Sequence, residues 1–498
     1  MAGGMKNLAK DTAIYGLSSI LGKFINWLLV PFYTRLLTQV EYGVVTNMYG
    51  FVALLIVLLT YGMETGFFRF VNKEEENPKT VYSTTLISIA FTSVLFVLLC
   101  WFNLGSISDV MGYANHSDYV IVMAVTVAID AFVSIPFAYL RYKKRPLRFA
   151  TLRLLSIFLT IAFTLFFLLA CPYIHKVNPD LIGWFYDPDY KVGYVFVANL
   201  LGSIITLILL LPEFTGFKYV LDKGLLKRML KYSFPLLILG VAGVLNQTID
   251  RIIYPSLFDD EQEAFSQLGV YGACFRIAVV MMMFTQAFRF AYEPFIFAKN
   301  KNLNDHKPYI EAMKYFVIFS LVIFLGVMFY IDIVKYFVGE DFLEGIKVVP
   351  IVMIGYIFFG IYFNLSFWYK MVDKTYFGAI FSLIGCAITV TIIVVFVPRY
   401  GYIASAWASL VCNLVMMVLS YIFEQKYHPI KYDLKKLGLY FAFALLLYAL
   451  GNIWVEIDNM ALRLLYRTAL LGVFLLVIVK NDVPLSEIPV LNKLIRRK

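Results

Sequence analysis

Long apolar runs dominate the sequence and limit what it can fold into. Each run is about 20 residues long, the length that an α-helix needs to cross the hydrocarbon core of a bilayer. A transmembrane barrel would instead show alternating segments of about 10 residues, and an open sheet cannot satisfy its backbone in lipid. We therefore predict an all-α integral membrane protein with about 14 transmembrane helices. The expected spans are about 12–34, 44–62, 81–102, 119–140, 150–171, 192–212, 233–257, 269–291, 312–331, 348–369, 376–397, 401–423, 437–454 and 462–480.

The composition leaves little mass outside the membrane. Of the 498 residues, 61% are hydrophobic and 15% are charged, whereas soluble domains have about 45–50% and about 25%. The longest connections expected outside, 103–118 and 172–191, are too short for a catalytic domain. The four histidines fall in loops without ligand spacing, and there is no Walker-type phosphate loop. We predict a transporter rather than an enzyme, with no cofactor and no metal site.

The basic residues predict how the spans are oriented. If the N-terminus is cytoplasmic and the spans alternate, the inside segments hold 32 of the 43 Lys and Arg residues. The outside segments then hold 7, and the spans themselves hold 4. Multi-span proteins carry such an excess in their cytoplasmic loops, so the net charge of +10 does not indicate nucleic acid. We predict a multi-pass protein with both termini in the cytoplasm.

Short stretches recur in the same order and direction in two halves of the chain. The matched pairs are Arg35 in "YTRLL" with Arg251 in "IDRII", "YGVV" (42–45) with "GVYG" (269–272), and Arg69 in "GFFRF" with Arg289 in "QAFRF". The first spans of both halves run from inside to outside. The halves are therefore predicted to be parallel repeats about an axis along the membrane normal, an arrangement that usually places a substrate site between two lobes.

This repeat predicts three parts of the chain. Residues 1–215 form an N-terminal six-helix lobe, and residues 216–435 form a C-terminal six-helix lobe. Residues 436–498 add two further transmembrane helices and a basic cytoplasmic tail.

Four stretches resemble a known family. They are "VPFYTRLLTQVEYG" (30–43), "LKYSFPLLILG" (230–240), "TIDRIIY" (248–254) and "GVYGACFRIA" (269–278), and they resemble the polysaccharide and O-antigen flippase branch of the MOP exporter superfamily. The resemblance covers spans 1–12. It implies two six-helix bundles that move undecaprenyl-diphosphate-linked oligosaccharide across the bacterial inner membrane, beside membrane lipids and other polysaccharide-assembly proteins. In the related lipid II flippases two C-terminal helices line a lipid-tail groove, although 441–454 carries no specific motif here.

Cations inside or at the ends of the spans are the candidates for binding such a substrate. A lipid diphosphate is a dianion, and the arginine fork stays ionised and binds two phosphate oxygens. We predict that the diphosphate and sugar cavity is lined by Lys23, Asn26, Arg69, Asn246, Arg251, Arg276 and Arg289. Alternatives remain open: Lys23 in a structural ion pair, Arg251 snorkelling outward, and Arg289 as a topology marker.

A second group of charged residues is predicted to gate the cavity or couple an ion. Asp130 is the clearest acid inside a span and either titrates or pairs with Lys23. Glu293 lies four residues after Arg289, the spacing of a helical ion pair. Arg35 and Asp250 complete the group.

Together these features predict a lipid-linked oligosaccharide flippase that works by alternating access. A proton or sodium gradient, or the substrate gradient itself, would supply the direction of transport. The first alternative is a multidrug exporter of the same fold, which would favour an acidic or apolar cavity. The second is a membrane-embedded glycan polymerase or transferase, which would need an acid or histidine pair and usually a large outside loop.

Overall fold

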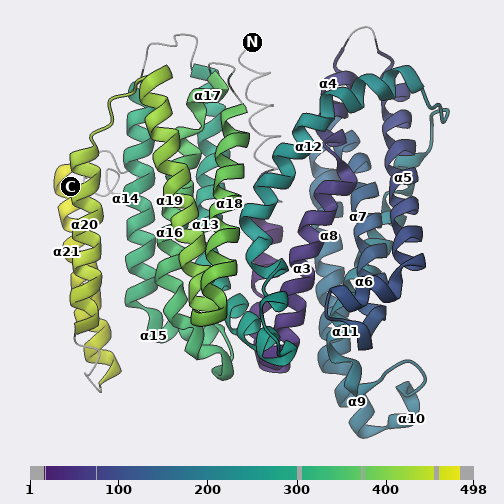
Figure 1. Ribbon diagram of the computed structural model, residues 1–498, viewed down its shortest axis with the longest axis horizontal. Coiled ribbons are helices and arrows are strands. Elements are labelled where there is room, and N and C mark those ends of the chain that lie inside the picture. The colour runs from purple at the N-terminus through teal and green to yellow at the C-terminus, as the bar shows by residue number, and fades with distance from the viewer. Residues whose placement is uncertain are drawn as a thin grey trace, which may run out of the picture. The chain divides into compact units, whose positions relative to one another are not determined.

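The computed structural model describes residues 16, 18, 20–73, 76–299, 306–371, 374, 376–453 and 459–482, and Figure 1 shows how their helices run. Within these residues the regular structure is helical, without strands, and 13 helices are long and apolar enough to cross a membrane. The first predicted span, 12–34, lies partly outside the described residues. The predicted fold class is therefore confirmed, and a count of about 14 helices is consistent with it.

The helices follow the apolar runs with short breaks between them. Their bounds are α2 Val30–Leu36, α3 Gln39–Thr60, α4 Met63–Val71, α5 Pro78–Phe102, α6 Leu104–Val110, α7 Ser117–Tyr142, α8 Pro146–Leu165, α9 Cys171–Val177, α10 Pro179–Ile182, α11 Lys191–Leu209, α12 Lys223–Ile252, α13 Glu261–Lys299, α14 Lys307–Phe329, α15 Ile331–Val334, α16 Val349–Leu365, α17 Phe367–Met371, α18 Tyr376–Tyr400, α19 Tyr402–Tyr427, α20 Leu434–Ile453 and α21 Met460–Asn481.

The chain divides into two compact units. Unit 1 comprises Met1–Ala273 and Tyr376–Ser409, and unit 2 comprises Cys274–Thr375 and Leu410–Lys498. The helices α13 and α19 each pass from unit 1 into unit 2. The three-part division expected from the repeat stays a prediction, and each unit is described by itself below.

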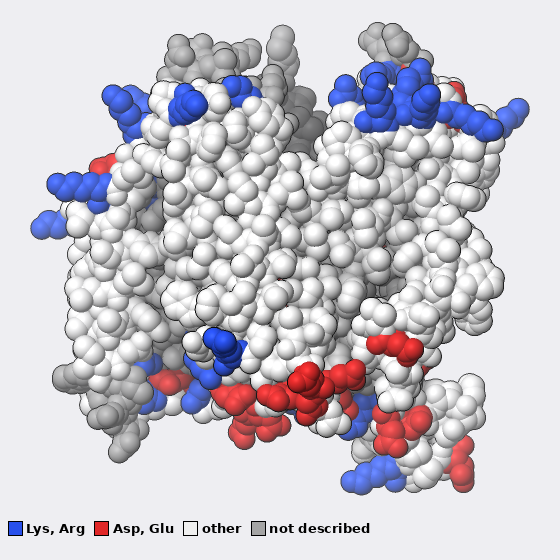
Figure 2. Space-filling model, in the orientation of Figure 1, with Lys and Arg blue, Asp and Glu red and all other residues white. Residues whose placement is uncertain are grey.

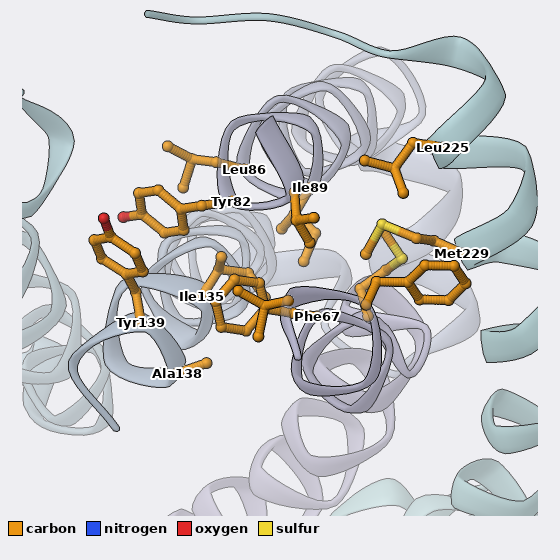
Figure 3. Close-up of a cluster of buried hydrophobic side chains, with 13 residues drawn as sticks. Phe67, Tyr82, Leu86, Ile89, Ile135, Ala138, Tyr139, Leu225 and Met229 are labelled. Carbon is orange, nitrogen blue, oxygen red and sulfur yellow. The ribbon is translucent and has the colours of Figure 1, made fainter. Parts of the chain in front are cut away.

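One end of unit 1 has an aromatic core where α4, α5, α7 and α12 meet (Figure 3). The rings of Tyr82 and Tyr139 stack with their centroids 3.9 Å apart, and Phe67 packs edge-on against both. Met229 of α12 and Phe67 are fully buried. In Figure 2, Lys and Arg side chains gather over this end of unit 1, whereas Asp and Glu gather at the opposite end.

The glycines of the two repeated stretches bring α3 and α13 into backbone contact. A Cβ atom on Gly43 would lie 1.9 Å from the carbonyl oxygen of Phe265, and one on Gly269 would lie 1.9 Å from that of Gln39. Each glycine thus meets the carbonyl four residues before the other glycine. Such a reciprocal contact is what a two-fold relation between the repeats would produce, and small residues permit this close approach in membrane helices.

The second transmembrane span is broken near its middle. Tyr61 and Gly62 both have left-handed backbone conformations, with φ of 32° and 71°. A non-glycine residue rarely adopts this conformation. The Ser233 hydroxyl donates to the Gly62 carbonyl at 3.3 Å. The span therefore continues as α4 beyond the predicted end at residue 62 and carries Arg69 in its last turn.

Unit 2 holds the last two helices against α14 and α15 by ion pairs at both ends. At one end Arg463 and Arg467 of α21 each donate to Oδ2 of Asp332 at 2.8 Å. At the other end Lys314 and Lys436 lie 3.1 and 2.7 Å from Oδ1 of Asp482.

The Asp482 carboxylate is buried between two partly exposed cations. Burial alone would raise the pKa of the Asp482 carboxyl, but hydrogen bonds from Lys436, Tyr440 and Lys314 hold that pKa below its ordinary value. Arg467, a buried cation within the last span, has a structural role because it also donates to the Gly451 carbonyl at 3.1 Å. The helix α20 is therefore held at both ends within unit 2.

Candidate functional site

The predicted site residues on α12 contact neighbouring helices at two positions. Asn246 donates from Nδ2 to the Ser382 carbonyl of α18 at 2.7 Å. Asp250 is buried, and its Oδ2 accepts from the Tyr271 hydroxyl of α13 at 2.8 Å. The Arg251 Nε atom lies 3.9 Å from Oδ1 of Asp250. These residues thus join α12 to α13 and α18 within unit 1.

Arg35, the repeat partner of Arg251, and other polar residues of the first two spans belong to the same unit. The amide of Asn47 on α3 donates to the Arg251 carbonyl at 2.6 Å and accepts from the Tyr113 hydroxyl at 2.7 Å. Arg35 is exposed in α2 and donates to the carbonyl of Pro31 at 2.7 Å. Lys23 and Asn26, which precede α2 in the chain, are also exposed.

Asp130 lies midway along α7 and is held by a hydroxyl. Ser203 of α11 donates to its Oδ1 atom at 2.6 Å. Arg153 of α8 acts on the same carboxyl electrostatically. A hydroxyl donor and a cation on α8 therefore act on Asp130, and its pairing with Lys23 stays a prediction.

The two matched arginines share a local arrangement. The guanidinium of Arg69 lies 4.1 Å from the centre of the Tyr232 ring in unit 1. That of Arg289 lies 4.7 Å from the centre of the Phe363 ring in unit 2. Both side chains are exposed. A guanidinium on an aromatic face gains about 0.5–1 kcal/mol at an exposed site, so each ring fixes the position of a cation near a helix end.

The remaining candidates lie further along α13. Arg276 is partly buried in unit 2. The side chain of Glu293 lies outside the described part of the chain, so its predicted pairing with Arg289 stays a prediction. All predicted site residues numbered 23 to 251 belong to unit 1, whereas Arg276 and Arg289 belong to unit 2. That they line one cavity also stays a prediction.

Unit 2 contains an apolar cavity of about 310 Å³ that the sequence did not single out. Four helices and the connection before α20 line it. The lining residues are Met313, Val317, Phe358, Ile361, Leu365, Met417, Val418, Tyr421, Tyr432, Leu434, Leu437, Gly438 and Phe441. These residues come from segments that lie far apart in sequence, so no single stretch signals the cavity.

Several ion pairs were also missed because each joins helices far apart in sequence. Arg141 of α7 pairs with Glu64 of α4 and lies 5.1 Å from the Phe68 ring centre. The buried Glu213 carboxylate lies 3.1 Å from Arg148. The signal that could have found them is an acid at the same end of a span as a cluster of basic residues.

Solved structures of transporters share this fold. A structure of the lipid II flippase MurJ in an inward closed conformation superposes with a TM-score of 0.72 at 17% identity, over 95% of this chain and 99% of that one. An inward-facing multidrug resistance MATE transporter gives a TM-score of 0.64 at 15% identity, over 83% and 97%. The chain therefore has the fold of the MOP superfamily transporters.

A match to a family profile identifies the family of the chain. The family described as "Polysaccharide biosynthesis protein" matches residues 8–298, and the chain belongs to that family. Two proteins of Haemophilus influenzae are similar. Protein 1 of the Lsg locus is 21% identical over 319 residues, which cover 63% of this chain and 71% of that protein. An "Uncharacterized membrane protein" is 22% identical over 402 residues, 76% and 91% of the two chains. The predicted family is confirmed, and the prediction of a transporter rather than an enzyme agrees with this family.

Proposed function

We propose that this protein is a flippase of the bacterial inner membrane. Its substrate is a polyprenyl-diphosphate-linked oligosaccharide, moved from the cytoplasmic to the outer face by alternating access. The family match and the similarity to a lipid II flippase support this substrate class. The observation that carries the proposal is the apolar cavity of unit 2, because a lipid-linked substrate must keep its hydrocarbon tail away from water while its headgroup moves.

The cavity suits an isoprenoid chain. Its lining is almost entirely aliphatic and aromatic, and burying such a chain there gains about 25 cal/mol per Å² of apolar surface. The clamped helix α20 provides one wall. The exposed arginines on aromatic rings suit the diphosphate instead, since their guanidinium edges can donate to phosphate oxygens.

One glycine makes the cavity open to a direct test. A Cβ atom on Gly438 of α20 would meet nothing within 4 Å, and Gly438 lines the cavity. We predict that Gly438→Phe fills the cavity and lowers transport to below about a tenth of the parental rate, which corresponds to roughly 1.4 kcal/mol. Transport is measured as surface polysaccharide in cells and as flipping of polyprenyl-diphosphate saccharide in proteoliposomes.

Gly472→Phe is the matched control. Gly472 lies in α21, also meets nothing within 4 Å, and does not line the cavity. Equal protein abundance with normal transport is expected for this control. If Gly438→Phe transports as well as Gly472→Phe, the cavity does not hold the lipid and the proposal loses its main support.

A further inference from the structure

A buried acid lies beside the apolar cavity and is not part of the predicted site. Glu424 is in the last turn of α19, and only 1% of its surface is exposed. Its Oε1 accepts from the Tyr432 hydroxyl at 3.1 Å, whereas Oε2 has no hydrogen-bond partner. No Lys, Arg or His within the described residues lies at ion-pair distance from this carboxyl. An ionised carboxylate without a cation is strongly disfavoured in such a position, so the environment fits the neutral acid.

The groups around Glu424 do not supply a compensating charge. Tyr432 approaches from the connection between α19 and α20, and Tyr292 of α13 and Tyr309 of α14 act electrostatically on Tyr432. These three are neutral phenols. The charged or titratable side chains on the adjoining segments include Lys426, whose ammonium lies 5.6 Å from the Tyr427 ring centre, and Lys374, at 3.7 Å from the same centre. They also include His428, whose ring lies 5.0 Å from that of His306, and Lys431 and Asp433 on either side of Tyr432.

Tyr432 connects this acid to the cavity. Its hydroxyl donates to Glu424, and its side chain lines the cavity. Gln425 also holds the connection, because its Nε2 atom donates to the Ile430 carbonyl at 2.8 Å. The short connection 428–433 is therefore tied to the last turn of α19 at two points, and the carboxyl of Glu424 is one of them.

We propose that Glu424 is a proton-binding site that controls the cavity wall formed by Tyr432. With a proton on Oε2 the acid is neutral, stays buried and keeps Tyr432 at the cavity. When the O–H bond breaks, the proton passes to water and the carboxylate retains the electron pair. The charged group must then reach water or a cation, which turns the last turn of α19 and releases residues 428–433. The role of the cavity as a lipid site rests on the proposed function, but the proton site does not.

The experiment uses the full-length protein in lipid nanodiscs. Infrared difference spectroscopy follows the C=O band of protonated carboxyl groups during a pH titration, and hydrogen exchange follows residues 428–433. The parent should lose one carboxyl band as pH rises, and the protection of 428–433 should fall at least about tenfold in the same range, as expected for a local opening. In Glu424→Gln that band is missing and 428–433 stay protected at all pH values.

Two further variants separate this site from general effects. Glu340→Gln changes an exposed acid of the same unit, so both the band and the pH-dependent opening should persist. Tyr432→Phe should keep the band but lose protection of 428–433 already at low pH. The proposal is overturned if the parent and Glu424→Gln share the same carboxyl bands, or if exchange in 428–433 does not depend on pH in the parent. Gly438→Phe should leave both readouts intact even where transport fails, so the two proposals are tested separately.

Discussion

At the scale of single residues, an aromatic ring holds each of the two matched arginines in place. A lysine or arginine that only fixes topology needs no fixed position, since its charge alone acts. Arg69 and Arg289 instead lie over Tyr232 and Phe363, which orient the guanidinium plane. The ring occupies one face, and the N–H groups along the edge keep the fork geometry that suits phosphate.

This geometry predicts that a lysine, which keeps the charge but not the fork, will not fully replace either arginine. Arg69→Ala and Arg289→Ala are each expected to lower flipping of a diphosphate-linked saccharide about tenfold or more, because a charge-assisted hydrogen bond contributes about 1.5–3 kcal/mol. Arg69→Lys and Arg289→Lys should recover only part of that loss. Flipping in proteoliposomes at matched protein amounts measures the effect.

Lys227→Ala is the control for this pair. Lys227 is exposed near the start of α12, at the same end of unit 1 as Arg69. Its removal should leave flipping unchanged. Normal flipping in both alanine variants would show that the two arginines are topology markers, the interpretation that the sequence left open for Arg289.

At the scale of elements, the contact between α3 and α13 depends on two glycines. Any side chain at Gly43 or Gly269 would overlap a carbonyl oxygen of the facing helix. Overpacking usually costs about 1–3 kcal/mol, and here a backbone rather than a flexible side chain would have to move. We predict that Gly43→Ala and Gly269→Ala each lower the thermal stability of the detergent-solubilised protein and its abundance in membranes.

Gly243→Ala tests whether this sensitivity belongs to the contact. Gly243 lies within α12, and a Cβ atom at this position would meet nothing within 4 Å. Alanine favours a helix over glycine by about 1 kcal/mol, so this control should match or exceed the parent in thermal stability. Equal stability of all three variants would mean that α3 and α13 can separate at no cost, and the reciprocal contact would have no structural role.

The elements also show what the sequence could and could not predict. Runs of about 20 apolar residues located the spans, because length and hydropathy are local properties. The continuation of the second span as α4 beyond the break at Tyr61–Gly62 was missed, because Glu64 and Arg69 interrupt the apolar pattern there. The matched glycines of "YGVV" and "GVYG" were found as a repeat, but their mutual contact required the packing of two helices.

The candidate site was predictable only in part for the same reason. Cations within the spans stand out in an apolar sequence, so Arg251 was recognised, whereas Arg467 was not among the predicted site residues. Whether such a cation binds substrate or pairs with Asp332 depends on which helices meet. Glu424 was hidden because "FEQKY" resembles an ordinary polar helix end, although its carboxyl is buried.

At the scale of the whole molecule, the charge distribution predicts which end of each unit faces the cytoplasm. The expected inside segments are rich in Lys and Arg, and this excess orients multi-span proteins. The assignment matters for function, because it puts Arg69, Arg289 and Glu424 at the face where a lipid-linked saccharide would enter. A flippase for outward transport needs its diphosphate-binding cations there.

Cysteine labelling can test this orientation in both units. In a variant without the five native cysteines, single cysteines replace exposed residues at the two ends of each unit: Lys227 and Asp189 in unit 1, and Lys435 and Glu340 in unit 2. An impermeant maleimide added to intact spheroplasts should label the cysteines at 189 and 340 but reach those at 227 and 435 only after lysis. The reverse pattern would move the arginines and Glu424 to the outer face, where they could not receive a substrate made in the cytoplasm. Opposite patterns in the two units would contradict the predicted alternation of the spans, which puts residues 227 and 435 on the inside and residues 189 and 340 on the outside.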